Sequence, residues 1–117
     1  MKTNIILLFA AIICLSFTQN SSQLLNTQLQ IMVLDENGNV QEDAEVKLYE
    51  TKEDFENEKY AVEPQLTNKK GKTRFKGLKE QAYYIEVSKG KKDNSLGAEM
   101  TSKLTLGKIN KINVIIQ

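Results

Sequence analysis

The chain has 117 residues, with 16 basic and 15 acidic side chains, no histidine and one cysteine. Without histidine it lacks the commonest acid–base group at neutral pH, which excludes Ser-His-Asp and Cys-His catalysis. Zinc and copper sites built from histidine and cysteine are excluded for the same reason. No two acids stand out as a glycosidase pair. We therefore expect neither an enzyme nor a bound cofactor.

Residues 1–18 resemble a removable secretory signal peptide. Lys2 is followed by an uncharged apolar run, IILLFAAIICLSF, at positions 5–17. This run is shorter than the ~20 apolar residues of a membrane span and suits the core of a signal peptide. We expect cleavage after Thr18 and export to the periplasm or the cell surface. The alternative is that the run forms a buried N-terminal strand.

Cys14 is a candidate lipobox cysteine, which would anchor the protein in the outer membrane. Ile13 precedes it where a lipobox has a small residue. Cleavage after Thr18 would instead leave a chain without cysteine, and so without disulfides in an oxidising compartment. Removing Lys2 from the 16 basic residues leaves 15, equal to the 15 acidic residues. This balance predicts no nucleic-acid partner, and membrane contact only through the signal peptide or a lipid anchor.

Residues 19–27 are predicted to be a polar tether, and residues 28–117 a single β-sandwich domain. Apolar residues occupy every second position in 29–33 and again in 44–48, which is the period of a strand with one buried face. The polar residues between these runs, with Gly38 able to adopt a positive φ, predict a turn.

The turn also matches part of a calcium-binding loop. Asp35, Asn37 and Asn39 stand at the positions of its first three oxygen ligands. Val40 then replaces the required glycine, and Val46 replaces the bidentate acid. The turn interpretation is therefore favoured, and calcium binding stays the alternative.

A short helix is predicted after the second strand. Thr51 is followed three residues later by Asp54, which resembles a capping box, and one or two helical turns through Lys59 would follow. The acids of this segment read as a solvated face rather than a metal cluster; they are Glu53, Asp54, Glu56 and Glu58.

Five further strands are predicted from alternation and turn residues. They lie at Tyr60 and Val62, at 72–75, at 83–88, at Leu104 and Leu106, and at 112–116. Seven short strands with regular turns predict an all-β fold, an antiparallel Ig-like β-sandwich with one short helix after the second strand.

Four segments, in order, carry a family resemblance. They are VLDENGNVQEDAEVKLYETKEDF, TNKKGKTRFKGL, YYIEVSKG and LGKINKINVII. Together they resemble a carboxypeptidase regulatory-like domain, a transthyretin-like (prealbumin-like) sandwich of exported Bacteroidetes-type proteins. That family usually carries a proline after the first turn and a glycine before the inward alanine, where this chain has Asn39-Val40 and Asp43-Ala44. The resemblance implies a non-catalytic module and names no ligand.

Two places could bind a ligand. Tyr49 and Tyr84 fall at outward positions, where aromatic side chains combine contact area with hydrogen bonding; the alternative is that they fill half-exposed sheet positions. The polar loop 89–97, with Lys91 and Asn94, is the second place, because such loops often hold binding residues.

We predict a structural or protein-binding module, and as the alternative an accessory glycan- or peptide-binding domain. A covalent Lys–Asn cross-link is disfavoured, because Asn113 lies in the last strand but the first strand has no lysine, and Lys47 is predicted to point outward. If residues 113–116 formed an outer strand, they would offer an edge for strand exchange.

Overall fold

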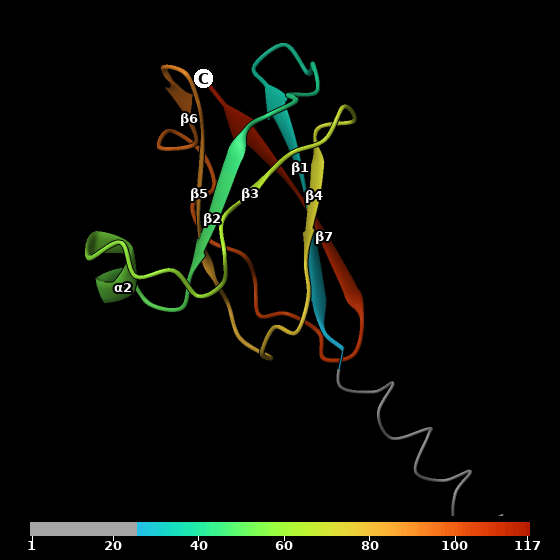
Figure 1. Ribbon diagram of the computed structural model, residues 1–117, viewed down its shortest axis with the longest axis vertical. Helices are drawn as coiled ribbons and strands as arrows, with labels where there is room; N and C mark the ends of the chain where they lie inside the picture. Colours follow the sequence, from blue (N-terminus) through green and yellow to red (C-terminus); the bar gives the residue numbers. More distant parts are fainter. Residues whose placement is uncertain (1–25) are drawn as a thin grey trace, which may run out of the picture.

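The computed structural model describes residues 26–117, so the predicted signal peptide, Cys14 and most of the tether lie outside the described residues. Figure 1 shows the arrangement of the short strands and of helix α2. The elements are β1 (Gln28–Asp35), β2 (Glu45–Tyr49), α2 (Lys52–Glu56), β3 (Gln65–Leu66), β4 (Lys72–Phe75), β5 (Tyr84–Lys89), β6 (Lys92–Asp93) and β7 (Ile109–Ile116). Between residues 26 and 117, none of the helical structure has the length and apolar character needed to cross a bilayer.

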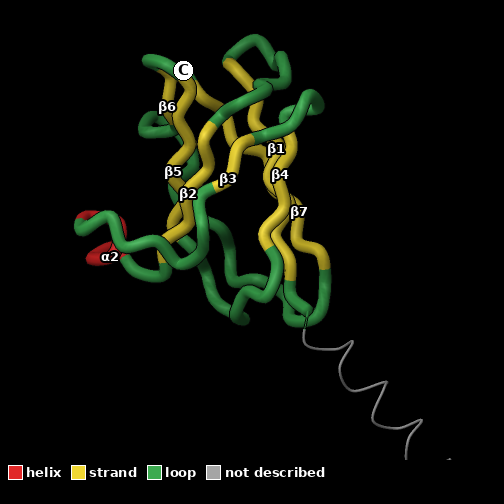
Figure 2. The backbone as a smooth tube through the Cα atoms, viewed as in Figure 1, coloured by secondary structure: helices red, strands yellow, loops and turns green. Residues whose placement is uncertain are grey.

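The strands form two facing sheets, one of three strands in the order β4-β1-β7 and one of four in the order β3-β2-β5-β6. Figures 1 and 2 show the two sheets side by side. Alternate residues of β1 and β5 point into the space between the sheets and are buried, as the period-two pattern predicts. The core is therefore made by inward side chains of both sheets, and the β-sandwich is confirmed. Its most buried aliphatic members are Leu29, Ile31, Val33, Val46, Leu48, Ile85, Val87, Val114 and Ile116.

The three-stranded sheet is mixed, so the prediction of purely antiparallel strands is wrong. β4 runs antiparallel to β1, but β7 runs parallel to it over eight residue pairs, from Gln28↔Ile109 to Asp35↔Ile116. Alternation of apolar residues shows which face of a strand is buried and carries no information about the direction of its neighbour.

The predicted strand at Tyr60 and Val62 is also wrong. This segment forms a bend, and a single backbone bond joins it to β2, from the Ala61 N–H to the Leu48 carbonyl at 2.8 Å. The short strand β3 begins only after the proline. Because proline has no N–H to donate to a strand ladder, the strand starts beyond it.

The predicted strand at Leu104 and Leu106 is an irregular segment. Leu104 is buried, whereas Leu106 is 49% exposed. The side chain of Asn110 accepts a hydrogen bond from the Thr105 N–H at 2.8 Å and donates to the Thr105 carbonyl at 3.1 Å. Side-chain bonds thus replace a strand ladder here. Conversely, the predicted loop 89–97 contains the short strand β6.

Two loops are hydrogen-bonded to Val33, near the end of β1. The carbonyl of Gly71 accepts from the Val33 N–H at 2.7 Å, and the Val33 carbonyl accepts from the Gln41 N–H at 2.9 Å. Gly71 has φ +72°, and a Cβ at this position would lie 2.9 Å from the Val33 oxygen. Only glycine combines this conformation with so close a backbone approach.

Asp43 occupies the position where the family resemblance expects a glycine, and it has φ +59°. Aspartate and asparagine adopt this conformation more readily than other residues with a Cβ. The next residue, Ala44, is buried, and its N–H donates to the Thr67 hydroxyl at 2.9 Å. The chain thus enters β2 in the geometry that a glycine would allow.

Candidate functional site

Helix α2 covers part of the outer face of the four-stranded sheet (Figure 1). It begins as predicted, because the Thr51 hydroxyl accepts from the Asp54 N–H at 3.0 Å and caps the first turn. Its Phe55 ring meets the Tyr49 ring edge-on, with 5.1 Å between centroids. We call Tyr49, Phe55, Tyr60 and Tyr84 the aromatic cluster; Tyr49 and Tyr84 lie directly opposite each other on β2 and β5.

Tyr49 faces outward from the sheet as predicted, but it is fully buried and cannot meet a ligand directly. The rings of Phe55 and Tyr60 cover it, and its hydroxyl donates to Oε1 of Glu86 at 3.2 Å. Burial, reinforced by the negative charge of Glu86, raises the pKa of Tyr49 to about 12. The prediction that Tyr49 is exposed is therefore wrong.

Lys47 lies over the Tyr60 ring of the aromatic cluster. Its ammonium lies 5.6 Å from the centroid of the Tyr60 ring, and 3.3 Å and 3.7 Å from carboxylate oxygens of Glu45 and Glu86. Tyr60 is 42% exposed, and Tyr84 is half-buried. Phe55 is half-buried as well, so a glycan or peptide could touch every ring of the cluster except that of Tyr49, and binding there stays a prediction.

The loop 89–97 folds as a hairpin, with Gly90 at φ +61° between β5 and β6. Asn94 is buried: its Oδ1 accepts from the Val87 N–H at 3.0 Å, and its Nδ2 donates to the Ile85 carbonyl at 2.9 Å. Asn94 thus satisfies backbone groups of β5 rather than presenting an amide to a ligand, contrary to the prediction of an accessible binding residue. Lys91 is exposed at the hairpin tip.

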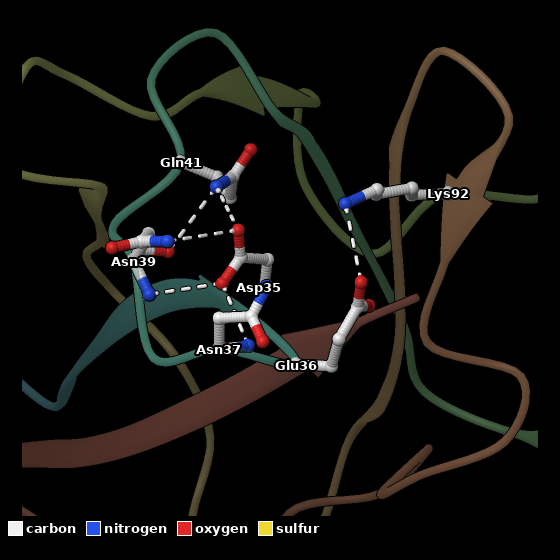
Figure 3. A network of polar contacts seen from close by, with 6 residues as sticks. All are labelled: Asp35, Glu36, Asn37, Asn39, Gln41 and Lys92. Atoms are coloured by element: carbon white, nitrogen blue, oxygen red, sulfur yellow. Dashed lines mark hydrogen bonds and ion pairs between the residues drawn. The ribbon is translucent and has the colours of Figure 1, made fainter.

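The calcium-like sequence forms a hydrogen-bonded turn (Figure 3). Oδ1 of Asp35 accepts from the N–H groups of Asn37 and Asn39, both at 2.9 Å, and its Oδ2 faces the side-chain amide of Gln41 at 3.3 Å. The backbone bond from Asn39, followed by that from Asn37, lowers the pKa of Asp35 against the opposing effect of burial. Donors therefore surround the carboxylate, where a calcium site would gather oxygens.

Neither metal nor cross-linking residues come together in residues 26–117. That part of the chain contains no group of three or more histidine, cysteine, aspartate or glutamate side chains placed to hold a metal ion. The buried positions of β1 are apolar except for Asp35 at its end, and Asn113 on β7 is exposed. A lysine for a cross-link is thus missing from β1.

A third surface, which the sequence reasoning missed, is the outer face of the three-stranded sheet. We call its cations the basic face: Lys70, Lys72, Arg74, Lys76 and Lys111. A shallow depression of about 330 Å³ lies on it, lined by Gln30, Asn68, Lys70, Lys72, Thr73 and Arg74. The sequence signal for it is the uneven distribution of charge: residues 35–63 hold eleven acids and three bases, whereas residues 64–117 hold four acids and twelve bases. This distribution does not show which of the bases share a face.

Comparison with known proteins identifies the fold. No family model and no curated protein matches this chain. Among solved structures, the Streptococcal ancillary pilin matches with a TM-score of 0.60 and 16% identity, over 80% of this chain and 32% of the pilin. The Bacillus anthracis TIE protein matches with 0.54 and 20% identity, over 79% and 17%. BcpA, the major pilin subunit of Bacillus cereus, matches in a D312A form with 0.53 and 15% identity, over 78% and 28%.

This chain spans a third or less of each of these structures. At such low identity the likeness concerns the arrangement of the strands and carries over no residue role. The chain folds as a β-sandwich of the kind found in pilin domains.

Proposed function

We propose that this chain is a non-catalytic β-sandwich module with a structural or protein-binding role, exported to the periplasm or the cell surface. We further propose that it belongs with the transthyretin-like, carboxypeptidase regulatory-like domains. The observation that carries the proposal is the similarity of the fold to pilin domains over about four-fifths of the chain. Two of the matched structures are an ancillary pilin and a major pilin subunit, which makes assembly with other proteins the function that this fold supports best.

The hydrogen bonds made by buried polar side chains support a structural role. Three of these side chains are bonded to the backbone. Thr67 accepts from the Ala44 N–H and donates to the Gln41 carbonyl, Thr101 accepts from the Tyr83 N–H at 2.9 Å, and Asn94 accepts from the Val87 N–H on β5 at 3.0 Å. These groups hold strands and loops in place.

The edge strand β7 supports protein binding. It lies at one end of the three-stranded sheet. Gln117, the residue that follows it, is joined to Asp93 of the other sheet by two backbone bonds of 3.0 and 3.3 Å. Ile109 and Ile115 on this strand are 44% and 50% exposed. Sheet edges are common sites for pairing with another chain, so we propose β7 as the contact surface.

Site-specific photo-cross-linking in intact cells tests this role. A photoreactive residue at Ile115 should give a discrete adduct of higher mass, and the same residue at Glu58, on the far side of the molecule, should give none. Adducts of equal yield at both positions, or none at Ile115, would contradict a specific contact at β7.

The proposed export is tested separately. Fractionation followed by intact-mass measurement should place the protein in the envelope or the medium, with a mature chain that begins after Thr18, or at a lipidated Cys14. Full-length protein recovered only from the cytosol would contradict it.

A further inference from the structure

Most cations of this protein lie in residues 64–117, and several of them share one side of the molecule. This basic block contains β4 and β7, which flank β1, as well as β3, β5 and β6 of the other sheet; the acidic block 35–63 contains β2 and α2. In Figure 1, α2 lies outside one sheet, and β4, β1 and β7 form the opposite side of the molecule. A chain with a formal net charge of +1 therefore presents one strongly cationic surface.

The basic face has no acidic residue among its outward strand positions. These positions are Gln28, Gln30, Met32 and Leu34 on β1, Lys72 and Arg74 on β4, and Ile109, Lys111, Asn113 and Ile115 on β7. The ion pairs found within residues 26–117 involve other lysines and none of the cations of the basic face. Arg74 donates to Oε1 of Gln30 at 2.8 Å, which holds the guanidinium against the sheet. The charges are thus available to a partner.

The cations are spread over the face rather than gathered at one point. Lys72 and Arg74 stand two residues apart on β4, about 7 Å along the strand. Arg74, Gln30 and Lys111 lie in register across the three strands, so Arg74 and Lys111 are separated by two strand spacings, about 10 Å. A single phosphate or sulfate cannot contact charges so far apart, whereas a polymer with repeated anionic groups can.

We propose that the basic face binds an acidic polysaccharide, a linear sugar polymer whose units carry carboxylate or sulfate groups. The cations match its charge, and the depression adds groups that suit sugar hydroxyls, the side-chain amides of Gln30 and Asn68. Amide side chains at the centre of the face, Gln28 and Gln30, favour a hydrated sugar chain over the interior of a lipid bilayer.

Binding of the purified protein to heparin and to alginate, with neutral dextran as the blank, tests the proposal. With about four charge contacts, the affinity should fall about 50-fold between 50 and 200 mM salt. The double variant Lys72→Gln/Arg74→Gln should weaken binding roughly tenfold and halve the slope of log affinity against log salt. Binding to heparin alone would assign sulfate as the recognised group, and binding to alginate alone would assign carboxylate.

The matched control is Lys52→Gln/Lys59→Gln, which changes the net charge equally on the α2 side and should bind like the parent. A second pair, Lys70→Gln/Lys111→Gln, repeats the test with cations outside β4, should the first pair alter folding as judged by thermal melting. Equal losses in the control and in the basic-face variants would overturn the proposal.

Three other outcomes would also overturn it. Tighter binding to a duplex oligonucleotide than to either polysaccharide would assign the face to nucleic acid. Binding to anionic phospholipid vesicles without binding to either polysaccharide would assign it to a membrane surface. Salt-sensitive self-association, seen by light scattering and lost in Lys72→Gln/Arg74→Gln, without polysaccharide binding would assign it to the acidic side of a second copy.

Discussion

The outer faces of the two sheets differ in what covers them. On the four-stranded sheet, α2 and the ring of Tyr60 lie over Tyr49, and Lys47 is paired with Glu45 and Glu86. On the three-stranded sheet, nothing in residues 26–117 covers Arg74, which is exposed and bonded to Gln30. An outward-facing side chain in a strand is therefore buried or exposed according to whether another segment of the chain packs over it.

The largest expected effect comes from the covered face. Tyr49→Ala should lower the free energy of unfolding by about 3 kcal/mol, because it removes a buried ring against which Phe55 and Tyr60 pack. Urea denaturation followed by circular dichroism measures this loss. Arg74→Ala on the uncovered face is the matched control and should change stability by less than about 0.5 kcal/mol; similar losses in both variants would contradict the distinction between the faces.

The next effect concerns the loops at the end of β1. Gly71→Ala should lower the free energy of unfolding by about 2 kcal/mol, because alanine is strained at φ +72° and its Cβ would meet the Val33 oxygen. Gly38→Ala is the control, since Gly38 also has a positive φ, of +84°, but open space where the Cβ would lie. It should cost about 1 kcal/mol; an equal cost at both glycines would show that the close approach at Gly71 is relieved by movement.

An alkaline titration should separate Tyr49 from the other tyrosines. Its pKa is raised to about 12, so the folded protein favours the neutral phenol. The stability from this burial is fully present below pH 10, the ordinary pKa of tyrosine, and is lost as the pH rises toward 12. Absorbance at alkaline pH should therefore show a late phase that Tyr49→Phe removes and Tyr84→Phe retains; a late phase that survives in Tyr49→Phe would assign it to another residue.

The smallest expected effect is on the acid side, at Asp35. Its pKa is lowered by the hydrogen bonds that it accepts, so its contribution is present above the ordinary pKa of 3.8 and is lost as the pH falls through its folded value. Asp35→Asn should lower the melting temperature at pH 7 and reduce its further drop below pH 4. If parent and variant lost stability in parallel on acidification, Asp35 would not contribute to the acid sensitivity of the fold.

Short-range signals predicted the local structure well. The strand at 72–75 and the helix cap at Thr51 were found where they were predicted, because alternation and capping depend on residues a few positions apart. The same alternation was misleading where the outcome depended on distant residues. Leu106 alternates with Leu104 but is exposed, since Asn110 ties this segment into a turn without a strand neighbour.

For the candidate site residues, too, local spacing predicted the face of the sheet correctly but did not predict burial. Tyr49 and Tyr84 share the outer face, as their spacing in the two strands implied, but burial of Tyr49 required a helix and a loop to return over it. Asn94 in a polar loop looked accessible, and its burial followed from the path of the hairpin beside β5. The basic face was hidden because overall charge balance averages over the whole chain, whereas its cations come from strands that are far apart in the sequence.

The sequence by itself determined that the described chain is mainly β, with strands that bury one face, since period-two burial and turn residues act over a few residues. It also determined the charges available and the exclusion of histidine chemistry. Only the tertiary structure decided that β7 runs parallel to β1, that Tyr49 is enclosed, and that the cations of β4 and β7 form one face. These features depend on which distant segments lie side by side, and local patterns carry no information about that.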